Sequence, residues 1–145
     1  MLANLSARVP RFARVTALAG FIGLLLGYAV FSSSFPSAMV PATGESSPLL
    51  VFGALFAAAF LVGLLSDDLL AGILQTFLAL PIGAAVASLL SLSPVFAGLI
   101  VTRPDDVIFF TFRLGFPLFF LSIPILLFGT VFGIVLQERF QVGRY

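Results

Sequence analysis

One arginine inside an apolar stretch is the side chain of this sequence best placed for chemistry. Arg113 follows Asp105 and Asp106 by eight and seven residues, in a stretch rich in phenylalanine. In a continuous helix, residues seven apart lie on nearly the same face, about 10 Å from each other along the axis. A cation in an apolar medium is costly unless it pairs or reaches water. Two roles stay open: Arg113 snorkels to headgroups or pairs with Asp105 or Asp106, or it contacts an ion, a substrate or another subunit.

Two further polar features interrupt the apolar sequence. Gln75 and Thr76 lie in the middle of a long apolar run, where an amide either makes an interhelical hydrogen bond or lines a pathway. Asp67 and Asp68 adjoin the start of that run. Carboxylates at a helix start favour its positive dipole end, and Ser66 or Asp67 is placed to cap the helix. The other interpretation of the acid pair is an entry site for a cation or proton.

Composition excludes several classes of chemistry. The chain has no Cys and no His, so it lacks disulfides, thiolates, the commonest metal ligands and the commonest general base. There is no nucleophile paired with a base and no phosphate-binding loop. We therefore predict no enzyme activity, no cofactor and no metal site. The net charge of +1 predicts no nucleic-acid partner.

Four long apolar runs position these side chains. The chain of 145 residues is 61% hydrophobic and only 9% charged, against about 25% charged in a soluble domain. A hydrocarbon core of about 30 Å takes roughly 20 helical residues, and backbone polar groups there must bond internally. We predict an all-α membrane protein, a single integral membrane domain over residues 1–145. Its bundle of four transmembrane helices is expected at about 15–33, 49–65, 68–90 and 112–136.

The first run has a second interpretation, a secretory signal, because arginines precede it and small residues follow it. Signal cores run about 7–15 residues. This run is longer and lacks a clear cleavage site, so we expect it to be retained as a span.

The arginines predict the orientation. Four spans place both termini on one side, and cytoplasmic ends of spans carry the excess of Lys and Arg. Only Arg103 lies in a predicted outer loop, whereas five arginines flank the first and last runs: Arg8, Arg11, Arg14, Arg139 and Arg144. We expect an N-in, C-in protein of the cell (plasma) membrane with both termini cytoplasmic.

The connections between the runs differ in character. An outer loop is expected at 34–48, and a tight inner turn at 66–68 predicts an antiparallel helical hairpin. Residues 91–111 are predicted to form an irregular apolar connection, broken or re-entrant, between the third and fourth helices. A helix running from 107 to 136 would exceed the membrane thickness, so we expect a break or bend near Gly115–Pro117.

Glycines four residues apart predict close helix packing. Gly23 and Gly27 form one such pair, and Gly129 and Gly133 form another. Small residues at this spacing let two helix backbones approach closely in a membrane. The pairs indicate tight packing within the bundle and, less strongly, self-association.

Two classes of function stay open. The short loops and the lack of catalytic groups favour a non-catalytic accessory or scaffolding subunit of a larger membrane complex, with the lipid bilayer and a membrane protein as partners. The alternative is a homo-oligomeric small channel or transporter with a pathway near Arg113 and Asp105 or Asp106. A single bundle with so few polar interior residues makes a poor pore, so the alternative requires self-association.

Overall fold

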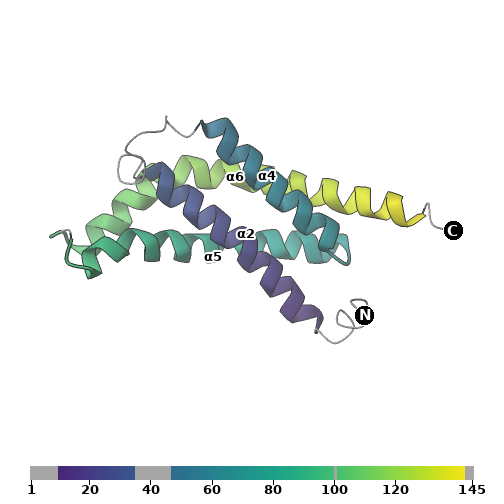
Figure 1. The fold of residues 1–145 in the computed structure, drawn as a ribbon, viewed down its shortest axis with the longest axis horizontal. Coiled ribbons are helices and arrows are strands. Elements are labelled where there is room, and N and C mark those ends of the chain that lie inside the picture. Colours follow the sequence, from purple (N-terminus) through teal and green to yellow (C-terminus); the bar gives the residue numbers. More distant parts are fainter. Residues whose placement is uncertain (1–9, 35–46, 100, 143–145) are drawn as a thin grey trace.

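The computed structural model describes residues 10–34, 47–99 and 101–142, and these residues form four helices (Figure 1). The helices are α2 (Arg11–Ser34), α4 (Pro48–Leu65), α5 (Leu69–Phe96) and α6 (Pro104–Val142). All four are long and apolar enough to cross a membrane. The protein is therefore an all-helical chain with the composition of a membrane protein. Most of the expected outer loop, residues 34–48, lies outside the described part of the chain.

The four helices alternate in direction along the chain, and helices that run in the same direction pack together in two pairs. A Cβ on Gly23 of α2 would meet Ile82 of α5, and one on Gly27 would meet Val86. These contacts advance in the same sense along both helices, so α2 and α5 are parallel. The α4–α6 pair is also parallel, because Phe56 lies against Gly129 and Phe60 against Gly133. The start of α2, the α4–α5 turn and the end of α6 consequently lie at one end of the bundle (Figure 1), which we call the turn end.

The α4–α6 interface is a contact between backbones. A Cβ on Gly129 would stand 2.8 Å from the carbonyl oxygen of Phe56. A Cβ on Gly133 would overlap the carbonyl oxygen of Phe60, and one on Gly63 would overlap that of Thr130. These glycines leave no room for any side chain, and the helices therefore approach as closely as backbones allow.

Glycines also allow close approach at the α2–α5 interface, but there they face mainly side chains of the neighbouring helix. A Cβ on Gly27 would lie 2.6 Å from Val86 Cβ and 2.7 Å from the carbonyl oxygen of Gly83. Gly83 in turn accommodates Leu26, which is fully buried. Both predicted glycine pairs thus lie in interfaces within the bundle.

The helices joined by the shortest connection have few contacts with each other. Ser66, Asp67 and Asp68 link α4 to α5, which run in opposite directions. Even so, α4 packs mainly on α6 and α5 mainly on α2. The glycine-lined faces, and not proximity along the chain, select the closest neighbours.

Most of the largest apolar side chains point outward, and the interior combines a few of them, such as Ile22, Leu26 and Leu126, with many small ones. Among the exposed residues are many Leu and Phe, such as Leu49, Phe77 and Phe128. The buried set is rich in small residues, including Ala19, Ala59, Ala79 and Ala87. In lipid, large apolar side chains gain little from burial, so the interior is left to residues that allow close packing.

The connection between α5 and α6 is shorter than predicted. Helix α5 continues past Pro94. Pro94 has no backbone N–H to donate to the carbonyl oxygen of Leu90, and Ser93 Oγ donates to that oxygen instead (2.7 Å). It ends where Gly98 adopts a φ of 70°, a conformation that disfavours a side chain. The prediction of an irregular segment at 91–111 is therefore wrong: only residues 97–103 lie between the two helices.

Helix α6 is unbroken where a break or bend was expected. Its 39 residues include Pro117 and Pro124 and run without interruption through Gly115–Pro117. The first part of α6, green in Figure 1, is inclined to the remainder, so the long helix changes direction without ending. Its first half packs on α2 and its second half on α4 and α5: Gly115 meets Val30, Gly133 meets Phe60, and Thr130 meets Thr76.

The glycine contacts generate a matched test. Gly133→Ala places a Cβ against the α4 backbone, and overpacking of this kind costs about 1–3 kcal/mol, so the free energy of unfolding should fall by that amount. Gly53→Ala is the control, because a Cβ there meets nothing within 4 Å. Alanine is favoured over glycine in a helix by about 0.5–1 kcal/mol, so the control should be neutral or stabilising. Unfolding in detergent micelles measures both, and equal effects would contradict the backbone contact.

Candidate functional site

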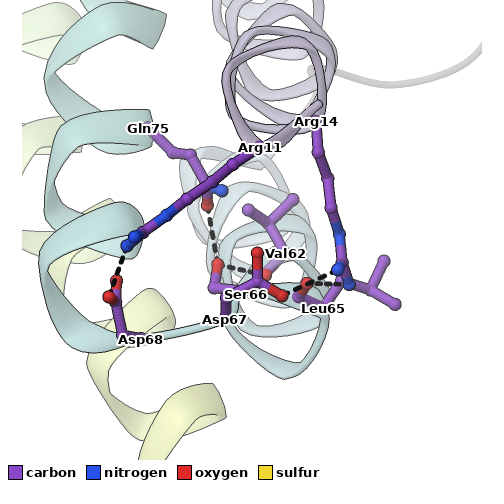
Figure 2. A network of polar contacts seen from close by, with 8 residues as sticks. All are labelled: Arg11, Arg14, Val62, Leu65, Ser66, Asp67, Asp68 and Gln75. Carbon is purple, nitrogen blue, oxygen red and sulfur yellow. Dashed lines mark hydrogen bonds and ion pairs between the residues drawn. The ribbon is translucent and has the colours of Figure 1, made fainter. Parts of the chain in front are cut away.

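The densest group of polar contacts lies at the turn end. Helix α2 begins with Arg11 and Arg14, three residues apart and therefore on one face. They lie over Ser66, Asp67 and Asp68, the turn between α4 and α5 (Figure 2). The group connects the start of α2 to the end of α4 and the start of α5.

Arg14 bonds to two acceptors on the turn. Its Nη1 donates to Asp67 Oδ1 (2.7 Å), and its Nη2 donates to the carbonyl oxygen of Leu65 (2.6 Å). Leu65 is the last residue of α4, so its carbonyl has no partner within the helix. The guanidinium thus supplies both a hydrogen bond and a positive charge to the negative end of α4.

Asp68 serves two neighbours at once. One carboxylate oxygen accepts the backbone N–H of Ala71 (2.7 Å) and so caps α5, and the other accepts from Arg11 Nη2. The residue that caps α5 is therefore Asp68, whereas Ser66 or Asp67 was predicted. The Ala71 N–H holds the pKa of Asp68 below its ordinary value, aided by Arg11 and opposed by partial desolvation.

Below the ion pairs, Ser66 and Gln75 make a buried contact. Both are 1% exposed. Ser66 Oγ lies 2.7 Å from Gln75 Oε1 and 2.8 Å from the carbonyl oxygen of Val62, and it donates its one proton to these acceptors in alternation. Gln75, the amide residue within the third apolar run, thus connects α5 to the end of α4.

This group is built to hold helices in register. The side chains of both ion pairs are 40–61% exposed, and exposed pairs contribute at most about 1 kcal/mol each in water. Their value lies in geometry, because two arginines from α2 fix the turn that joins two other helices. Across the described ranges 10–34, 47–99 and 101–142, no three of Asp, Glu, His and Cys come together to hold a metal.

The arginine singled out from the sequence lies at the other end. Arg113, Asp105 and Asp106 are all exposed on α6. Among the described residues the ion pairs are Arg11–Asp68 and Arg14–Asp67, so Arg113 is paired with neither acid. Gln75 lies at the turn end, away from Arg113, Asp105 and Asp106.

Sequence reasoning missed the pairing of Arg11 and Arg14 with Asp67 and Asp68. It used the arginines to predict the orientation, and it interpreted the acids as a helix cap or as an entry site for a cation or proton. The signal was available, because both groups were expected at the inner ends of spans with opposite charges. What was missing was the neighbour relation, since nothing in the sequence places the start of α2 over the α4–α5 turn.

Comparison of the chain with models of protein families, with curated proteins and with solved structures gives no match. The class is therefore defined by the architecture alone: an all-helical protein with four helices long and apolar enough to span a membrane.

The two roles of Asp68 can be separated by substitution. Asp68→Asn keeps a good capping residue but loses the charge that Arg11 meets, whereas Asp68→Ala loses both. We expect the thermal unfolding midpoint in detergent to fall more for the alanine variant than for the asparagine variant. Equal losses would show that the cap contributes nothing.

Acid should weaken the same contact. The folded pKa of Asp68 is lowered, so its contribution is complete above the ordinary value of 3.8 and is lost as pH falls through the folded pKa. Wild type should therefore lose more of its midpoint than Asp68→Asn between pH 7 and pH 3. Parallel pH profiles of the two proteins would contradict the lowered pKa.

Proposed function

We propose that this protein is a non-catalytic accessory or scaffolding subunit of a larger membrane complex. The observation that supports the proposal is the hydrogen bonding of the buried polar side chains. Within the part of the chain that the structure describes, every buried side-chain nitrogen or oxygen has a hydrogen-bond partner. Those partners belong to the chain itself, as in Thr76 with Thr130 or Ser34 with the carbonyl oxygen of Thr111.

A conducting pathway needs polar groups that turn toward a passing solute. Here the interior hydroxyls are committed to helix carbonyls or to each other, for example Ser91 to Ala87 and Thr111 to Val107. The space between the helices is taken up by glycine contacts and small side chains. These features support a packed structural bundle over a pore within one chain.

The outward surface supports association in the membrane. Large apolar residues are exposed along all four helices. Lipid covers such a surface, and so does a neighbouring membrane protein. The proposed partners are the bilayer and another membrane protein of the complex.

We propose that the turn end faces the cytoplasm and that the protein resides in the cell (plasma) membrane, N-in and C-in. Arg11, Arg14 and Arg139 lie at the turn end, and Arg103 and Arg113 lie toward the other, so the described arginines favour the turn end by three to two. The rule counts basic residues and takes little account of acids, so the pairing of two arginines with Asp67 and Asp68 leaves it unchanged.

A second candidate is a homo-oligomeric channel or small transporter. It is favoured by one observation, the exposure of Arg113 without an ion pair in the described chain. Its pathway would run between copies, near Arg113, Asp105 and Asp106.

The test of function is native mass spectrometry after gentle extraction from the source membrane. Stoichiometric foreign chains that co-purify with this protein are the expected result. Purified protein that forms a defined homo-oligomer and conducts ions or solutes in liposomes would overturn the proposal in favour of the channel. A monomer free of partners would remove both.

The orientation has its own test, made simple by a chain without cysteine. Glu138→Cys places a thiol on the last turns of α6 at the turn end, and Thr102→Cys places one at the opposite end; both positions are exposed. In intact cells a membrane-impermeant maleimide should label Thr102→Cys only, and permeabilised cells should label both. The reverse pattern would place the turn end outside.

A further inference from the structure

The depth of Arg113 follows from two contacts between α2 and α6. Ser34 Oγ donates to the carbonyl oxygen of Thr111 (3.1 Å), and a Cβ on Gly115 would lie 2.5 Å from Val30 Cγ1. Arg113 lies midway between Thr111 and Gly115 along α6. It is therefore level with the last turn of α2, where the apolar run gives way to Ser32, Ser33 and Ser34. In a membrane spanned by these helices, the end of this apolar run marks the approach to the headgroup level.

No described acid of the chain is placed to pair with Arg113 at that level. Asp105 and Asp106 lie about two helical turns, or 10 Å, further from the membrane centre. The other described acids, Asp67, Asp68 and Glu138, lie at the turn end. In a second copy of the chain in the same orientation, the described acids lie at these same levels and supply no counter-charge there.

Exposed phenylalanines adjoin Arg113 on the same helix. Phe109 and Phe110 precede it by four and three residues, and Phe116 follows by three, so all are its neighbours on the helix surface. Phe116 stacks on Phe120, with ring centroids 6.1 Å apart. Exposed rings thus lie on both sides of Arg113 along α6, and those of Phe116 and Phe120 lie on the side toward the membrane centre.

We propose that this surface binds a phospholipid, with the Arg113 guanidinium on the phosphate and an acyl chain along Phe116 and Phe120. The planar guanidinium presents paired donors that match phosphate oxygens. A phospholipid also carries its anion directly above its apolar chain, which is the order in which α6 presents Arg113, Phe116 and Phe120. A carboxylate on a partner helix would satisfy the charge alone and gives no reason for this order.

The test compares two lipids and two arginines by native mass spectrometry of the full chain in detergent. The probes are dioleoyl phosphatidylglycerol and dioleoylglycerol, which share acyl chains but differ in the phosphate headgroup. The variants are Arg113→Gln and, as a control of equal charge loss, Arg103→Gln, which removes an exposed arginine at the same end of the bundle. Size-exclusion profiles check that both variants keep the fold.

Wild type and Arg103→Gln should bind phosphatidylglycerol alike, and Arg113→Gln should bind it about tenfold more weakly, as expected for a lost charged hydrogen bond. Dioleoylglycerol should bind wild type no better than it binds Arg113→Gln. Equal losses in both variants, or equal binding of the two lipids by wild type, would overturn the proposal. So would a foreign protein retained through Arg113 in place of lipid. If Arg113→Gln misfolds, the comparison of the two lipids on wild type decides.

Discussion

The structure depends on contact between helix backbones at glycine. In a membrane, lipid tails are as apolar as the side chains, and burial of large apolar groups supplies little drive for folding. Dispersion forces and carbonyl contacts at short range take over that role, and they require residues without side-chain bulk. Gly63, Gly129 and Gly133 meet this need between α4 and α6, as Gly23 and Gly27 do between α2 and α5.

These contacts explain the arrangement of the helices. Each glycine-lined face selects a parallel partner two helices along the chain, so the first helix meets the third and the second meets the fourth. The alternation of direction then gathers the start of α2 and the α4–α5 turn at one end. The ion pairs from Arg11 and Arg14 follow from this arrangement, and they add register to it where the bilayer gives way to water.

The length of α6 gives the bundle its second polar region. With 39 residues it is longer than a straight span requires, and it carries two prolines. Its first part turns onto the end of α2, where Ser34 bonds to the α6 backbone. Arg113 is brought to the same level, away from the charges of the turn end. The two ends of the protein thus differ: at one, Arg11 and Arg14 are paired with acids of the chain, and the other presents an exposed cation beside exposed aromatic rings.

Sequence alone determined the class of structure, four helices able to span a membrane, because hydrocarbon leaves the backbone no other way to satisfy its hydrogen bonds. It also identified the glycine pairs, since their spacing on a helix is a local property. Only the tertiary structure decided which helices the glycines join, because any glycine-lined face fits several partners.

The same limit explains the other differences. The sequence predicted a break or bend near Gly115–Pro117, and α6 changes direction without a break. It also predicted an irregular segment at 91–111, but helices in membranes tolerate proline when hydroxyls satisfy the freed carbonyls, as Ser93 does for Leu90. The pairing of Arg14 with Asp67 and the separation of Gln75 from Arg113 likewise depend on contacts between segments distant in sequence. Periodicity and composition describe each helix, and the neighbours of each helix are decided by packing.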